Sequence, residues 1–188
     1  MNDQRRLFFA LWPENTVRQQ IQSASFPRLK PRTTPRENWH MTLVFLGLTL
    51  PDQQIRLERA AARVNAKPFT LSLDTTGQFL SAQVAWLGCA HLHKELVSLQ
   101  GKLESVLRDS CPEHPVFVSG VRPYCPHVTL YRHIRKSHTP EKIKAVNWPV
   151  SSFCLIESRP AERPVYRVLN RWNLCEPMQE TSLRILNL

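Results

Sequence analysis

The chain has 188 residues, of which 42% are apolar and 21% charged, with 5 glycines and 15 prolines. This composition is typical of one folded domain and excludes collagen-like and glycine-linker architectures. Lys and Arg number 25 against 15 Asp and Glu, for a net charge of +10; such a field attracts polyanions and favours RNA or another phosphate-bearing ligand over a generally basic soluble protein.

Short apolar runs alternate with helical patterns along the chain. Residues 69–73 alternate apolar and polar side chains, as a half-buried strand does. One helical stripe is formed by leucines at steps of four, three, four and four: Leu92, Leu96, Leu99, Leu103 and Leu107. Strands are expected at residues 7–12, 39–48, 69–73, 83–88, 127–131, 148–157 and 165–174, helices at 14–24, 51–65 and 91–108, and one helical turn at 141–145. The pattern favours an α+β fold with antiparallel sheets over a doubly wound parallel sheet.

The five cysteines follow no disulfide or zinc pattern. Their number is odd, and no C-x-x-C pair occurs among Cys89, Cys111, Cys125, Cys154 and Cys175. Cys89, His91 and His93 lie close together, but no matching ligands occur elsewhere, so this segment is expected to be an exposed helix N-terminus. We therefore predict no metal, no other cofactor, and reduced thiols in the cytoplasm.

The N-terminal segment is not typical of a signal peptide, because its apolar run at residues 7–12 is short and is followed at once by Pro13 and Glu14. No stretch approaches 18 apolar residues, so no membrane span is predicted.

A four-residue motif occurs twice. His40-Met41-Thr42-Leu43 and His127-Val128-Thr129-Leu130 both have the form His-x-Thr-Leu, and they lie 87 residues apart. The chance of two copies is roughly one in a thousand. Since residues i and i+2 share a strand face, each motif presents one imidazole and one hydroxyl to the same side. Two imidazoles can act as acid and base on one phosphate, and two hydroxyls can donate to its oxygens.

The paired motifs resemble the two-histidine phosphoesterase superfamily, and more closely its bacterial RNA 2′,3′-cyclic phosphodiesterase family, also called 2′-5′ RNA ligase. The similarity covers nearly the whole chain, in segments 6–10, 40–47, 84–88, 126–132 and 166–172. It implies that residues 1–188 form a single bilobal catalytic domain, with two antiparallel sheets in pseudo-twofold symmetry around a central cleft and helices outside. It implies metal-free hydrolysis of a terminal 2′,3′-cyclic phosphate to a 2′-phosphate, and a weak reverse reaction that joins RNA ends by a 2′-5′ bond.

The resemblance also implies roles for individual residues. His40 is the proton donor and His127 the proton acceptor, while Thr42 and Thr129 hold the phosphate. Arg132 matches an arginine that contacts the substrate phosphate.

Arg132 and Phe45 occupy equivalent places, each five residues after its histidine. Regular strand geometry turns Arg132 away from the cleft, so its role requires the strand to end or bulge near Tyr131. For Phe45 the default is core packing, and the alternative is base stacking.

Other basic residues flank the motifs. For Arg28, Lys30, Arg32 and Arg36, a solvated loop and a contact with the RNA backbone are equally weighted. His133 and His138 are expected to face solvent, although their proximity to Arg132 allows a phosphate contact.

The expected partner is RNA with 2′,3′-cyclic phosphate ends, with tRNA fragments as one candidate, and the expected state is a monomer without membrane contact. Two alternatives stay open: a non-catalytic RNA-binding module of the same fold, and a phosphodiesterase acting on a small cyclic nucleotide or an ADP-ribose cyclic phosphate. Both motifs are complete, which favours the enzyme.

Overall fold

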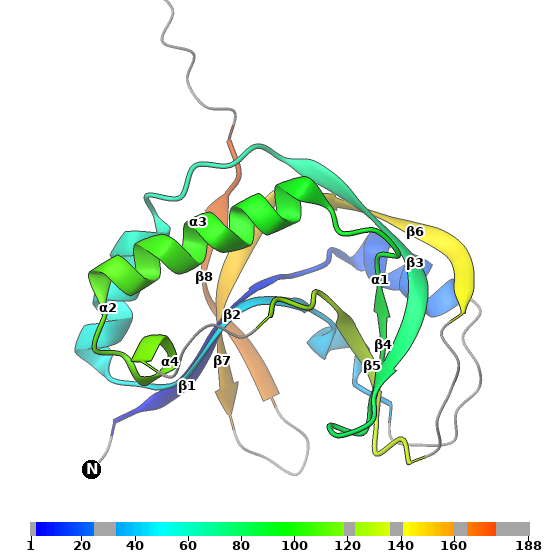
Figure 1. Cartoon of the computed structure of the whole chain (residues 1–188), viewed down its shortest axis with the longest axis horizontal. Helices are drawn as coiled ribbons and strands as arrows, with labels where there is room; N and C mark the ends of the chain where they lie inside the picture. Colours follow the sequence, from blue (N-terminus) through cyan, green and yellow to red (C-terminus); the bar gives the residue numbers. More distant parts are fainter. Residues whose placement is uncertain (1–2, 25–32, 119–122, 136–140, 160–164, 176–188) are drawn as a thin grey trace, which may run out of the picture.

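Eight antiparallel strands form a single sheet within the residues that the computed structural model describes, which are 3–24, 33–118, 123–135, 141–159 and 165–175 (Figure 1). The strands are β1 (Arg5–Leu11), β2 (Met41–Thr49), β3 (Phe69–Phe79), β4 (Val84–Gly88), β5 (Val128–Arg132), β6 (Lys142–Val150), β7 (Ser152–Arg159) and β8 (Val165–Asn173). The helices are α1 (Asn15–Ser23), the 3-10 turn η1 (Arg36–Asn38), α2 (Pro51–Ala61), α3 (Lys94–Ser110) and α4 (Pro115–Val118).

The sheet consists of two similar halves. Its strand order is β6-β3-β4-β5-β2-β1-β7-β8, and the central strands β5 and β2 share a single residue pair, Met41 with Val128. In one half β1, α1 and β2 follow one another, and in the other half β4, α3 and β5 do the same. The α+β fold expected from the sequence is confirmed, and the two expected sheets are joined at this pair into one.

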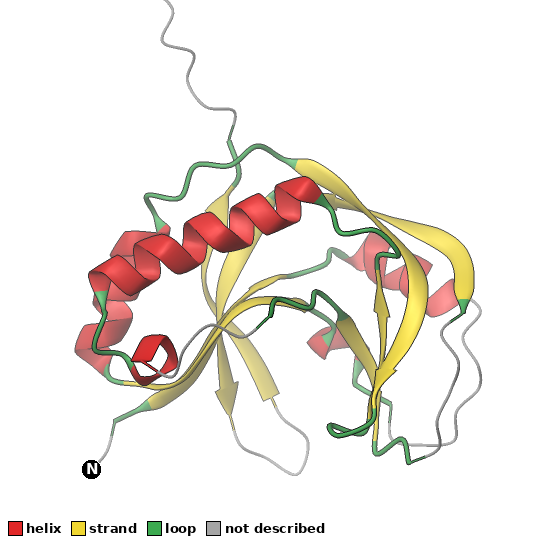
Figure 2. Cartoon of the chain, in the orientation of Figure 1, coloured by secondary structure: helices red, strands yellow, loops and turns green. Residues whose placement is uncertain are grey.

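The helices connect the halves to each other. Figure 2 shows α2 and α3 side by side over the sheet, and α3 packs against β2 of the opposite half, while α1 packs against β6. Leu96, Leu99, Leu103 and Leu107 are fully buried in the main core, which also holds residues from both halves of the sheet. Leu92 of the predicted stripe lies before the helix and is 57% exposed, so its assignment to the core was wrong.

Two predictions around the sixth strand were also wrong. The helical turn expected at residues 141–145 is the start of β6, where Val146, Trp148 and Val150 alternate into the core along β3. The strand expected at 148–157 is interrupted at Ser151, between β6 and β7. Pro149 is accommodated because β6 is an edge strand, whose outer N–H groups need no partner. No helix among the described residues is long and apolar enough to span a bilayer.

Candidate active site

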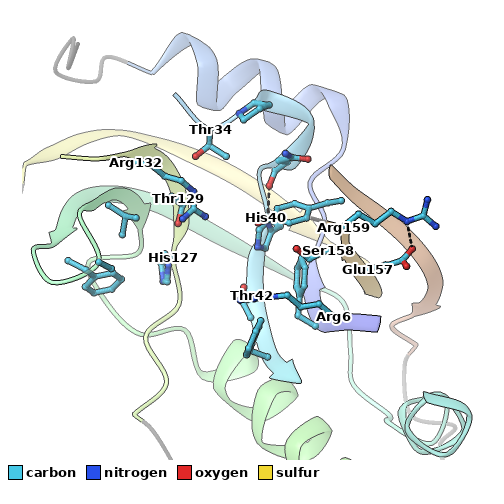
Figure 3. Close-up of a pocket in the computed structure, with 18 of the residues that line it drawn as sticks. Arg6, Thr34, His40, Thr42, His127, Thr129, Arg132, Glu157, Ser158 and Arg159 are labelled. Carbon is cyan, nitrogen blue, oxygen red and sulfur yellow. Dashed lines mark hydrogen bonds and ion pairs between the residues drawn. The ribbon is translucent and has the colours of Figure 1, made fainter. Parts of the chain in front are cut away.

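A cleft of about 1040 Å³ lies where the two halves of the sheet meet. It is lined by both motifs and by residues from both lobes (Figure 3). The residues that line the cleft include Arg6, Phe8, Thr34, His40, Thr42, Phe45, Phe79, His127, Thr129, Arg132, His133 and Tyr166. The structure therefore brings together the residues that sequence reasoning had selected from two distant segments.

The two histidines are held in the same way. His40 precedes β2, and its Nδ1 lies 2.7 Å from the carbonyl oxygen of Asn38. His127 precedes β5, and its Nδ1 lies 2.8 Å from the carbonyl oxygen of Cys125. A carbonyl only accepts hydrogen bonds, so each Nδ1 carries the proton. Each neutral imidazole therefore keeps its Nε2 lone pair available.

A bulge follows the threonine in each motif. On β2, Thr42 pairs with Ala10 and Val44 pairs with Phe9, so that Leu43 is an extra residue. On β5, Thr129 pairs with Trp86 and Tyr131 pairs with Ala85, so that Leu130 is an extra residue. An extra residue reverses the parity of the strand beyond it.

The bulges explain why the residue five places after each histidine reaches the cleft. Because of the extra Leu130, Arg132 lies on the same face as Thr129, and it lines the cleft. The expectation that β5 must bulge near Tyr131 is confirmed. The equivalent Phe45 also lines the cleft and is 46% exposed, so core packing was the wrong default for it.

Aromatic rings surround His40 on several sides. The ring centroids of Phe8, Trp12 and Tyr166 lie 4.8, 5.9 and 5.2 Å from that of His40. Burial, partly offset by the bond to the Asn38 carbonyl, lowers the pKa of His40 from 6.5 to about 4. The positive charges of His127, Arg132 and Arg18 lower the pKa of His40 further.

His127 has a more open surrounding. Phe79 and Trp86 lie 4.9 and 6.3 Å from its ring centroid. Burial is the main cause that lowers the pKa of His127, and the charge of Arg132 acts in the same direction. Both imidazoles therefore favour the neutral form at neutral pH in the free protein.

The other basic residues singled out in the sequence have different outcomes. Arg36 donates to the Gln22 side chain at 3.0 Å and to the Asn15 carbonyl at 3.2 Å, which holds it against α1. His133 lines the cleft with a φ of 62°, a conformation uncommon outside glycine. Arg28, Lys30, Arg32 and His138 lie outside the described residues.

The segment with Cys89, His91 and His93 precedes α3. His93 stacks on Phe69 at 5.4 Å and pairs with the carboxylate of Glu95 at 3.0 Å. Within the described ranges, no group of three or more His, Cys, Asp or Glu could hold a metal ion.

Sequence reasoning missed several residues of the site. The guanidinium of Arg6 lies over the Phe45 ring at 5.1 Å, and Tyr166 touches both Phe8 and His40. The side-chain oxygen of Thr34 is buried beside the cleft, and no residue that the structure describes gives it a hydrogen-bond partner. Arg6 and Phe8 could have been assigned from strand parity, since they are two residues apart on β1. Thr34 and Tyr166 carry no such local signal.

A bilobal sheet with one His-x-Thr strand in each half, both facing one cleft, defines a two-histidine phosphoesterase fold. The chain belongs to the 2′-5′ RNA ligase superfamily, whose family model matches residues 12–162.

Two relatives match the chain over different lengths. The RNA 2′,3′-cyclic phosphodiesterase of Escherichia coli (strain K12) is 34% identical over 183 residues, 94% of this chain and 100% of that protein. The protein of the same name from Archaeoglobus fulgidus is 30% identical over 93 residues, 44% of this chain and 51% of that protein. Among solved structures, E. coli LigT complexed with 3′-AMP matches with a TM-score of 0.80 and 31% identity, covering 93% of this chain and 100% of that chain.

Proposed function

We propose that this protein hydrolyses the terminal 2′,3′-cyclic phosphate of RNA to a 2′-phosphomonoester. The observation that carries the proposal is the matched pair of imidazoles, each fixed through Nδ1 by a backbone carbonyl and each lining the same cleft. The activity named for the E. coli relative, which matches this chain almost end to end, supports it.

The two histidines divide the proton transfers. Neutral His127 accepts a proton at Nε2 from a water molecule, whose oxygen attacks phosphorus. The bond between phosphorus and the ribose O3′ breaks, and His40 gives O3′ a proton. The product carries the phosphate on O2′, and the two rings exchange protonation states with solvent before the next cycle.

The lowered pKa of His40 has a consequence for this scheme. A general acid must carry its proton, yet burial leaves His40 neutral in the free protein. An anionic phosphate in the cleft favours the imidazolium, because an opposite charge nearby stabilises the charged form. The proton on His40 therefore enters together with the substrate.

The other four site residues bind the substrate. Thr42 and Thr129 donate to the non-bridging oxygens, where charge grows in the transition state. Arg132 supplies a positive charge to the same phosphate, and Phe45 offers a stacking surface for a base. All four side chains line the cleft, which supports this division of roles.

We also propose the conditions under which the protein acts. The reaction needs no metal, the protein acts as a monomer and a single domain, and a weak 2′-5′ joining reaction accompanies hydrolysis. All five cysteines are free thiols, which supports a cytoplasmic location.

The test is a product assay on a short RNA ending in a 2′,3′-cyclic phosphate, with EDTA present. We expect complete turnover to the 2′-phosphomonoester, and none in the His40→Ala/His127→Ala double variant. Loss of turnover on chelation, restored by zinc or magnesium, would contradict the metal-free mechanism. Tight binding without turnover would indicate a binding module, and turnover only of a cyclic mononucleotide would indicate a small-molecule phosphodiesterase.

A further inference from the structure

Arg18 is a buried cation behind the candidate active site. It projects from α1, is 5% exposed, and forms no ion pair within the part of the chain that the structure describes. Burial, and then the nearby charge of Arg36, lowers the pKa of Arg18 from its ordinary value. A buried charge of this kind is unfavourable unless its hydrogen bonds are well satisfied.

The guanidinium of Arg18 connects two backbone segments. Its Nε donates to the Pro13 carbonyl at 2.9 Å, just after β1. Its Nη1 donates to the Arg36 carbonyl, at the first residue of η1. The turn η1 ends at Asn38, whose carbonyl accepts the Nδ1 proton of His40. Arg18 therefore fixes the turn that carries the acceptor for His40.

Arg18 also reaches His40 through a ring. Its guanidinium lies over the ring of Trp12 at 5.1 Å, and Trp12 is stacked against His40 at 5.9 Å with 17° between the planes. Trp12 therefore contacts both the guanidinium of Arg18 and the imidazole of His40. A cation over the face of an indole favours one orientation of that ring.

We propose that Arg18 is a positioning residue for His40: through Trp12 and the η1 turn it holds the imidazole with its Nδ1 proton on the Asn38 carbonyl and with Nε2 toward the phosphate. Arg18 and Trp12 are not among the residues that line the cleft, so we expect neither of them to contact the substrate. Figure 3 shows His40 joined by a dashed line to the backbone that precedes it, with its ring directed into the cleft. The rings that contact His127 are Phe79 and Trp86, and among the described residues no arginine lies over either of them.

The first readout does not depend on activity. In protein labelled with ¹⁵N-histidine, long-range ¹H–¹⁵N correlations distinguish the Nδ1–H from the Nε2–H tautomer at neutral pH. We expect His40 to be an Nδ1–H tautomer in the wild type and to shift toward Nε2–H in Arg18→Met, while His127 stays unchanged. This arm remains informative even if the proposed hydrolysis is absent.

The second readout rests on the proposed function. Because misplacement of a reacting group by about 1 Å can cost roughly 100-fold, we expect kcat of Arg18→Met to fall by roughly 10- to 100-fold with little change in KM. Arg18→Lys keeps the charge but cannot bond both carbonyls in the fork geometry, so it should stay impaired. A lysine variant equal to the wild type would contradict the proposal.

Arg108→Met is the matched control. Arg108 also lies over an aromatic ring, that of Phe117 at 5.8 Å, and pairs with Glu104, but it does not line the cleft. It should leave the His40 signals and kcat unchanged. If Arg18→Met does not fold, Trp12→Leu removes the intervening ring and should give the same tautomer shift. Wild-type His40 signals and wild-type kcat in a folded Arg18 or Trp12 variant would overturn the proposal.

Discussion

At the scale of single residues, the two histidines differ in their surroundings more than in their backbone bonds. His40 lies among Phe8, Trp12 and Tyr166, whereas His127 contacts Phe79 and Trp86. Both pKa values are lowered by burial, and that of His40 reaches about 4. A repeated motif has thus become two chemically different groups through the residues packed around each copy.

The division of the two proton transfers can be tested with the leaving group. His40→Ala and His127→Ala should each lower kcat by roughly 10²–10⁴-fold, the range for general acid–base catalysis. A p-nitrophenyl phosphodiester needs no proton on its leaving oxygen, so it should partly rescue His40→Ala and not His127→Ala. Thr42→Ala and Thr129→Ala should cost less, since the proton transfers remain.

The measurement is kcat on both substrates, with circular dichroism as the folding control. Equal rescue of the two histidine variants would remove the acid and base assignment while leaving the site intact.

The lowered pKa of His40 also predicts how stability depends on pH. In the unfolded chain His40 takes up its proton near the ordinary pKa of 6.5, whereas in the folded protein it does so only near 4. The free energy of unfolding is therefore highest, as far as His40 determines it, above pH 6.5, and it falls as the pH drops toward 4. The contribution of this group is roughly 1–3 kcal/mol, after allowance for partial solvent exposure.

Urea unfolding at pH 7 and pH 4.5 measures this loss. His40→Asn should lose less stability between the two pH values than the wild type. Part of the loss should remain in the variant, because burial also lowers the pKa of His114 and of His127. An equal loss in both proteins would contradict the pKa of His40.

At the scale of the elements, the bulges at Leu43 and Leu130 decide which side chains form the cleft. Strand parity alone predicted His40, Thr42, His127 and Thr129 correctly as cleft residues, because they precede the bulges. Without the extra residue, Phe45 and Arg132 would face the opposite side of the sheet. No glycine marks either bulge, so the sequence indicated only that Arg132 could reach the cleft if its strand ended or bulged.

The same limit explains the other features that the sequence could not supply. The helical stripe of α3 and the alternation of β3 are local patterns, and both were predicted. Residues Lys142–Val150 form a strand because they pair with β3, which is a contact between distant segments. Trp12, Arg18 and His40 meet only in the folded chain, and neither their spacing nor their periodicity indicates it.

The β3–β4 pairing predicts the effect of a single methyl group. Gly77 pairs with Trp86, and a Cβ at Gly77 would overlap the Trp86 ring, which packs against His127. Gly77→Ala should lower the free energy of unfolding by about 1–3 kcal/mol through overpacking and should reduce kcat. At Gly101 in α3, a Cβ meets nothing within 4 Å, so Gly101→Ala should stabilise by about 0.5–1 kcal/mol with unchanged kcat.

Urea unfolding and kcat for the two variants decide this prediction. If Gly77→Ala is as stable and as active as Gly101→Ala, Trp86 does not support His127.

At the scale of the whole molecule, the net charge of +10 predicts how RNA length and salt act together. Each phosphate of single-stranded RNA that the protein neutralises lowers the slope of log K against log salt by ~0.7. A 20-mer should therefore lose affinity with salt more steeply than a dinucleotide with the same cyclic phosphate end. Fluorescence anisotropy at several salt concentrations measures both slopes, and equal slopes would limit the phosphate contacts to the terminal dinucleotide.

Each half of the sheet is covered in part by a helix from the other half, and this arrangement limits how the two halves can move relative to each other. Helix α1 packs on β6, helix α3 packs on β2, and one core continues beneath both. A hinge motion that opens or closes the two lobes would therefore expose that core. A cyclic phosphate held in the cleft would therefore stay beside bulk solvent, which supplies the water molecule of the proposed hydrolysis. If the protein also joins RNA ends, a second RNA end would have to compete with that solvent for the same phosphorus atom, so this architecture would favour the proposed hydrolysis over joining.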